Sequence, residues 1–167
     1  PLMSGHYETG DELPADMLEK MLAAKNFQSA MQMMRQLEFS LFDFSIHCNY
    51  RQHQTDNCSI HDELNRIRNQ VAVITPPEFN RFECGFSHIF AGGYAAGYYS
   101  YKWAEVLSAD AFSLFEENGI FDKASGDAFK RNILEQGGSQ EPMDLFVAFR
   151  GREPSVDALL RHSGLAL

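Results

Sequence analysis

Residues 86–107 combine a histidine, glycines and tyrosines at spacings that could serve chemistry. His88 precedes a glycine-rich turn (Gly92, Gly93, Gly97), and tyrosines then run into an expected helix at Tyr94, Tyr98, Tyr99 and Tyr101. Spacings of four and three predict that Tyr94, Tyr98, Tyr101 and Glu105 share one helical face, as far as the helix reaches back past Gly97. A tyrosine hydroxyl donates a hydrogen bond without being ionised at neutral pH. This face could therefore offer hydroxyl donors to a ligand.

A second stripe beside the tyrosine face is expected to carry the apolar packing; it comprises Tyr99, Trp103, Val106, Leu107 and Leu114. Ordinary core packing is the alternative for the tyrosine face too, because a tyrosine ring buries a large area while its hydroxyl finds a partner. The adjacent glycines favour a ligand, since Gly-Gly is typical of sharp bends and close approaches. Their spacing does not match a dinucleotide-binding fingerprint.

The segment His88–Trp103, HIFAGGYAAGYYSYKW, resembles the glycine-loop signature of the thimet oligopeptidase family of zinc metallopeptidases. The likeness continues through three later stretches, namely Ala104–Phe112, Gly137–Ser139 and Phe149–Pro154, and ends with Asp157–His162. It covers essentially the whole chain. The resemblance implies an all-α class: the multi-helical C-terminal part of a neurolysin-like zincin catalytic domain, with an irregular glycine-rich loop, as one unit over residues 1–167.

The zinc of this family is held by a helical His-Glu-x-x-His, in which the two histidines bind the metal and the glutamate acts as general base. That pentapeptide does not occur here; the nearest string, His61–Asn65, has the wrong residue after its histidine and no second histidine. We therefore expect a fragment that starts downstream of the metal site. Zinc would belong to the full-length enzyme, with ligands outside this chain, and the fragment alone would bind no metal and be inactive.

The resemblance also implies roles for individual residues. Tyr101 is the candidate for stabilising the oxyanion during peptide hydrolysis, and His88 for a supporting donor. Tyr94, Tyr98 and the backbone of Gly92 and Gly93 would hold the peptide and let the loop close over it. The expected partners are short peptide substrates and the missing N-terminal part of the polypeptide.

Composition narrows the function classes. Acidic residues outnumber basic ones, 23 against 14, for a formal net charge of -9, and no basic cluster occurs. Binding to nucleic acid or to an anionic membrane is therefore not expected. No signal peptide and no apolar run long enough to span a bilayer is evident. The three cysteines form an odd set without a CxxC pair, which indicates reduced thiols and a cytoplasmic protein.

The periodicity of apolar residues predicts helices throughout. They begin at Pro14 and at Asn26 as N-cap, the second running to about Tyr50, and continue over about 60–73, 96–117, 126–135, 142–148 and 154–163. In the helix over 126–135, we expect Phe129, Ile133 and Leu134 to point inward. His6 and Tyr7 are expected in an exposed loop, and the methionines between Met17 and Met34 in the core. A cut through a larger helical domain would expose apolar surface on the 26–50 helix, so self-association is expected.

Two other interpretations stay open. Soft ligands gather between residues 47 and 61, and a structural zinc could take four of His47, Cys48, His53, Cys58 and His61, although their spacing matches no known ligand pattern. Alternatively, the chain is a small helical protein-interaction module that uses the tyrosine face, since tyrosine is common at interface hot spots. A generic interface would not produce so long a match to the peptidase loop.

Overall fold

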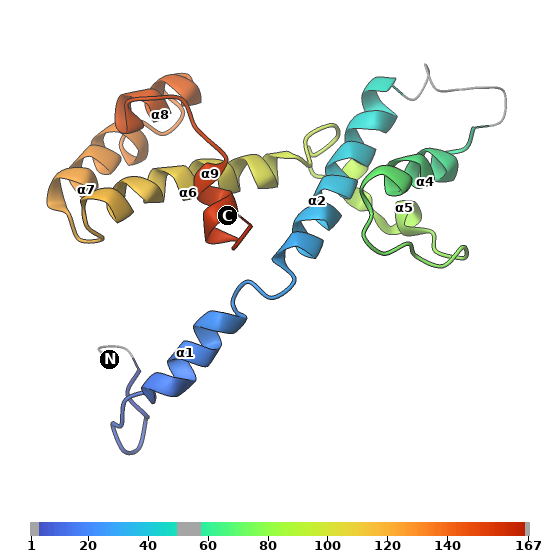
Figure 1. The fold of residues 1–167 in the computed structure, drawn as a ribbon. Coiled ribbons are helices and arrows are strands. Elements are labelled where there is room, and N and C mark those ends of the chain that lie inside the picture. Colours follow the sequence, from blue (N-terminus) through green and yellow to red (C-terminus); the bar gives the residue numbers. More distant parts are fainter. Residues whose placement is uncertain (1–3, 50–57, 166–167) are drawn as a thin grey trace.

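The computed structural model describes residues 4–49 and 58–165, and within these ranges it contains helices and no strand (Figure 1). The all-α prediction is confirmed. The α-helices are α1 (Ala15–Ala24), α2 (Ser29–Phe44), α4 (Ile60–Val71), α5 (Phe82–Gly85), α6 (Ser100–Asn118), α7 (Lys123–Phe129), α8 (Pro142–Arg150) and α9 (Asp157–His162). Segments of π-helix continue α2 over Ser45–Asn49 and α7 over Lys130–Leu134, and a 3-10 turn spans Ser87–Ile89.

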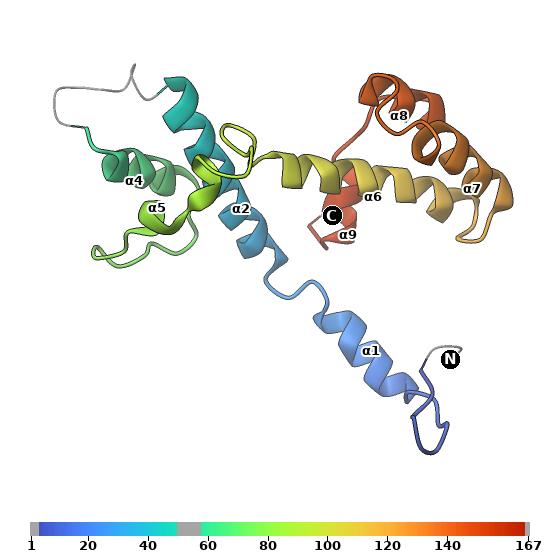
Figure 2. The ribbon, with the colours of Figure 1, turned by 180° about the vertical axis from the view of Figure 1, so that it is seen from behind.

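The helices form two groups that meet at the glycine-rich loop (Figures 1 and 2). In the first group α2 packs against α4, with α5 beside α4. In the second, the long helix α6 contacts α7, α8 and α9. Helix α1 projects away from both groups, and none of its residues is buried. The loop between the 3-10 turn and α6 therefore connects the first group of helices to the second.

The apolar core of the first group lies directly beneath this loop. Phe42 of α2 and Leu64 of α4 are fully buried, and Phe86 and Ile89 pack against them from the approach to the loop. The ring of Phe39 lies 5.3 Å from that of Phe86, centroid to centroid. Because Phe86 and Ile89 flank His88 on both sides, this core fixes where the histidine stands.

Buried charges tie α2 to α4. Glu38, 1% exposed, accepts hydrogen bonds from Arg68 Nε at 2.9 Å and from Arg35 Nη1 at 2.8 Å. Glu63 is fully buried and bonded to Arg66 Nη2 at 2.6 Å and to Ser45. A buried carboxylate is costly unless it is paired, so these contacts set one arrangement of the two helices.

In the second group Asp110 of α6 is fully buried and joins the helix to the chain before α9. Arg152 donates to both of its carboxylate oxygens, at 2.5 and 2.7 Å, and the Ser155 N–H donates at 2.7 Å. The buried apolar side chains of this group come mainly from α8, with smaller ones from α6 and α9: Leu145, Phe146, Phe149, Val106, Ala109 and Ala158.

Helices α7 and α9 begin at Lys123 and Asp157, each three residues from the predicted start. Two further predicted starts, those of α2 and α6, are wrong for a shared backbone reason. Helix α2 begins at Ser29 rather than after an Asn26 cap, because Gln28 adopts a left-handed φ of 56°. Helix α6 begins at Ser100 rather than Ala96, where φ is 54°. A non-glycine residue rarely takes this conformation, and sequence patterns do not signal it. Tyr50, His53 and the predicted turn at 55–57 lie outside the described residues.

Several residues predicted to be buried are exposed. Met17 and Met21 are 50% and 61% exposed, so their predicted core role is wrong here. In the expected apolar stripe of α6, Val106 is buried, whereas Trp103 is 43% exposed. Leu134 is exposed too. His6 and Tyr7 lie in an exposed loop, as predicted. No helix among the described residues has the length and apolar character needed to cross a bilayer.

Candidate functional site

The structure gathers the four aromatic side chains that the sequence singled out. The ring of His88 meets those of Tyr94, Tyr98 and Tyr101 edge-on, with centroids 5.3, 5.4 and 6.2 Å away. Tyr94 and Tyr101 are stacked at 5.2 Å, and Tyr98 meets Tyr101 at 5.3 Å. We refer to His88, Tyr94, Tyr98 and Tyr101 as the tyrosine cluster.

The spacing predicted that the tyrosines share one helical face, and this prediction is wrong. Helix α6 begins at Ser100, so of the three tyrosines only Tyr101 is helical. Tyr94 and Tyr98 reach the others because the loop folds back through successive turns: the Gly97 N–H donates to the Tyr94 carbonyl at 2.7 Å, and the Ser100 N–H to the Gly97 carbonyl at 3.0 Å.

The two predicted glycines take backbone conformations that need glycine. Gly92 and Gly93 have φ values of +71° and +77°, in the left-handed region. A Cβ on Gly92 would stand 3.3 Å from the Tyr94 ring, whereas one on Gly93 would meet nothing within 4 Å. The glycine at position 92 thus lets the backbone pass close to a ring of the tyrosine cluster.

Two residues of α2 that the sequence analysis missed bind the loop. Asp43 of α2 accepts hydrogen bonds from the N–H groups of Ala96 and Tyr98, each at 3.0 Å. Gln36 accepts one from the Tyr98 hydroxyl at 2.9 Å. The only available signal was an acidic residue within the apolar run Leu41–Phe44, which does not say what the acid contacts.

The tyrosine hydroxyls differ in what they are free to do. Partial burial raises the pKa of Tyr98, and its hydroxyl is already committed to Gln36. Tyr101 is 41% exposed, and a hydrogen bond with the Tyr94 side chain raises its pKa. Both phenols therefore stay protonated at neutral pH, and Tyr101 is the more exposed of the two.

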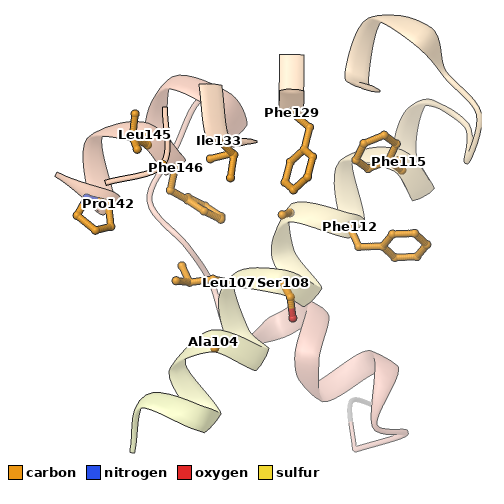
Figure 3. Close-up of a pocket in the computed structure, with 12 residues that line it drawn as sticks. Ala104, Leu107, Ser108, Phe112, Phe115, Phe129, Ile133, Pro142, Leu145 and Phe146 are labelled. Carbon is orange, nitrogen blue, oxygen red and sulfur yellow. The ribbon is translucent and has the colours of Figure 1, made fainter. Parts of the chain in front are cut away.

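Two hollows lie near these helices. The smaller one, about 550 Å³, adjoins the tyrosine cluster through His88 and Tyr98 and has the rings of Phe39, Phe82 and Phe86 in its wall. The larger, about 580 Å³, lies away from the cluster between α6, α7 and α8, where Phe129 and Phe146 point toward α6 (Figure 3). Its lining is almost entirely apolar and offers no group for acid–base chemistry, so the smaller hollow is the one that belongs with the site.

The described residues do not fit a zinc site. Among them, no three His, Cys, Asp or Glu side chains stand together as they would around a metal ion. His47 Nδ1 lies 2.8 Å from the Asp43 carbonyl oxygen, and His61 Nδ1 lies 2.8 Å from Glu83 Oε1. Cys48 is exposed, and His53 of the proposed ligand set lies outside the described residues.

The described residues thus form helices around a glycine loop lined by a histidine and tyrosines. The chain belongs to peptidase family M3, whose family model matches residues 1–165. It is 59% identical over 163 residues to oligopeptidase A of Escherichia coli K12, a match that covers 98% of this chain and 24% of that protein.

More distant relatives match over the same extent. A probable cytosolic oligopeptidase A of Arabidopsis thaliana is 49% identical over 164 residues, covering 96% of this chain and 23% of the relative. Saccharolysin of Saccharomyces cerevisiae is 33% identical over 165 residues, covering 98% and 23%. The chain thus spans about a quarter of the length of the relatives that it matches.

Proposed function

We propose that this chain is the C-terminal part of a cytoplasmic zinc metalloendopeptidase that hydrolyses short peptides. The observation that carries the proposal is the family match over residues 1–165, which includes the whole glycine loop. The name oligopeptidase A, borne by a relative 59% identical to the chain, supports the substrate class. The rest of the polypeptide would supply the zinc ligands and the general base.

In this proposal, zinc held by ligands in that other part would supply Lewis-acid chemistry at the scissile carbonyl and at the attacking water. The residues of this chain act on the oxyanion that develops. A neutral hydroxyl suits this task, because it donates a hydrogen bond where negative charge forms and needs no proton change of its own. Tyr101 combines a raised pKa with an exposed ring. It is the catalytic residue we assign to the chain.

The other members of the tyrosine cluster support Tyr101 and the peptide. His88 stands within edge contact of all three tyrosines and serves as a second donor. Tyr94 stacks on Tyr101 and orients it. Tyr98, whose hydroxyl is held by Gln36, contributes its ring to the peptide-binding wall. Gly92 and Gly93 bring the backbone close to the substrate and let the loop close.

The test is Tyr101→Phe in the complete enzyme. Loss of one oxyanion donor lowers turnover by about a hundredfold to a thousandfold, while the ring still stacks on Tyr94 and folding is unchanged. The measurement is kcat with a short quenched peptide, together with a thermal unfolding curve. Tyr99→Phe is the matched control, because Tyr99 contacts Phe44 at 5.1 Å and lies outside the tyrosine cluster. Turnover near that of the wild type would contradict the proposal.

A second candidate, a protein-interaction surface, is favoured by the exposed aromatics beside the loop. Phe90 is 78% exposed and Tyr99 is 45% exposed. A ring-based interface would tolerate Tyr101→Phe and lose affinity on Tyr101→Ala, because it uses the area of the ring rather than the hydroxyl. The same pair of variants therefore separates the two functions.

A further inference from the structure

The loop that carries the tyrosines is tied to α2 by one fully buried carboxylate. Asp43 is 0% exposed. Its Oδ1 accepts the Ala96 N–H and its Oδ2 accepts the Tyr98 N–H, both at 3.0 Å. The two amides belong to residues on either side of Gly97, 53 and 55 positions along the chain from Asp43. Since both donors are main-chain groups, the contact fixes the path of the backbone whatever the side chains are.

These hydrogen bonds stabilise both the Asp43 carboxylate and the loop backbone. A buried carboxylate without hydrogen-bond partners is costly, and each of these two oxygens has a donor from the loop. His47 is the other titratable group beside it, with Nδ1 3.3 Å from Asp43 Oδ1 and 2.8 Å from the Asp43 carbonyl oxygen. On the loop side, Ala96 holds a left-handed φ of 54°, which a non-glycine residue keeps only when its surroundings impose it. The carboxylate imposes it.

Tyr98 connects the hydrogen bonds of Asp43 to the tyrosine cluster. Helix α2 holds this residue twice, by its N–H at Asp43 and by its hydroxyl at Gln36. The ring is thereby fixed against Phe86 at 5.0 Å and His88 at 5.4 Å. By contrast, Gly92 and Gly93, in the first half of the loop, are exposed.

We propose that Asp43 is the positioning residue of the glycine loop, which anchors residues 96–98 to α2 and leaves residues 91–93 as the part that moves over a bound peptide. The inference deepens the proposed function and rests on it for its catalytic consequence. The anchor itself is a matter of backbone hydrogen bonding and is measured without any assay of activity.

The wild type provides the first measurement. In hydrogen–deuterium exchange on the complete enzyme, resolved to single amides, Ala96 and Tyr98 exchange slowly and Gly92 and Gly93 exchange fast. Equal rates in the two halves of the loop would overturn the inference, and no variant is needed.

Two substitutions then remove the anchor by degrees. Asp43→Asn keeps the shape and one acceptor but places an amide N–H₂ opposite one loop N–H, and Asp43→Ala removes both acceptors. Hydrogen bonds to a charged group are strong, so each one lost speeds exchange of its amide about tenfold or more. At Ala96 and Tyr98, exchange is expected to be slowest in the wild type, faster in Asp43→Asn and fastest in Asp43→Ala. Unchanged rates in both variants would overturn the inference.

The matched control is Asp110→Asn, which changes another fully buried and multiply bonded aspartate, one that holds the chain before α9 rather than the loop. It leaves exchange at residues 96–98 at the wild-type rate under conditions where the protein is folded. A similar acceleration in this control would assign the effect to general destabilisation and overturn the inference.

Activity separates this inference from the proposed function. Misplacing the tyrosines lowers kcat in Asp43→Asn by about tenfold to a hundredfold, with a smaller change in KM. Faster exchange with unchanged kcat would overturn the positioning role. If Tyr101→Phe also keeps full turnover, the proposed function fails as well, whereas a large loss in Tyr101→Phe alone leaves that function standing.

Discussion

Tyr98 and Tyr101 are three residues apart, and their surroundings give the same side chain two different tasks. The Tyr98 hydroxyl donates to Gln36 on α2 and is spent on holding the loop. Tyr101 is exposed, and its hydrogen bond with Tyr94 keeps its pKa above the ordinary value. The two phenols differ in partner and exposure rather than in whether they are hydrogen-bonded: Tyr98 is held by another helix, whereas Tyr101 stays within reach of a substrate.

The glycines of the loop provide a prediction at the scale of single residues. Gly92→Ala and Gly93→Ala both force a left-handed φ on alanine and should each lower the free energy of unfolding by about 1 kcal/mol. Gly92→Ala should cost more than Gly93→Ala, because only its Cβ meets the Tyr94 ring, at 3.3 Å. Urea unfolding of the two variants side by side measures the difference. Equal losses would mean that the Tyr94 ring yields at no cost.

At the scale of elements, sequence patterns located the helices but missed the residues at which two of them begin. The apolar period of α4, Pro14 before α1 and Pro142 at the first position of α8 place those helices within a few residues of where they lie. The starts of α2 and α6 were missed because left-handed residues at Gln28 and Ala96 interrupt otherwise helical sequence. At Ala96 a contact with the distant Asp43 accompanies this conformation, and local propensity does not contain such a contact.

In the site, too, some residues could be found from the sequence and others only from the structure. The resemblance named the tyrosine cluster and the structure brings all four residues together. Asp43 and Gln36 could not be found in this way, because their importance lies in contacts that span 53 to 62 residues. One sequence carries no direct record of pairs so far apart, and an acid or an amide in a helix has many other possible uses.

The buried aspartate of α6 makes stability depend on pH. Burial would raise the pKa of Asp110, but hydrogen bonds from Arg152 and the Ser155 N–H outweigh it, and the pKa lies below its ordinary value. A lowered folded-state pKa means that the stabilisation is present above the unfolded pKa, about 4, and is lost as the pH falls through the folded value.

Asp110→Asn should therefore lower the free energy of unfolding near neutral pH by about 3 kcal/mol, since it leaves Arg152 without its buried carboxylate partner. The loss should shrink as the pH falls below about 4, because the wild type is then protonated too. Denaturant unfolding across this range tests it. Asp16→Asn is the control: its ion pair with Lys20 is exposed, so little change is expected. A pH-independent difference at Asp110 would count against the ion-pair account.

At the scale of the molecule, many large apolar side chains of the described residues are exposed. Along α2, Leu37, Leu41 and Phe44 are 37%, 41% and 38% exposed. None of the residues of α1 is buried, and an apolar hollow lies between α6, α7 and α8 (Figure 3). Contiguous apolar surface of this kind is typical of faces that another chain or segment covers. In the proposed enzyme, the remaining three-quarters of the polypeptide is available to do so.

The isolated 167-residue chain should consequently self-associate. Sedimentation velocity over a range of concentrations should give a weight-average mass above the 18.9 kDa monomer, rising with concentration. Leu41→Glu on the open face of α2 should shift the distribution toward the monomer, because it places a charge within the apolar surface that associates. Phe121→Glu is the matched control: Phe121 is 97% exposed and stands in a turn away from α2, so its replacement should change association little. A monomer at all concentrations would mean that these faces are stable in water by themselves.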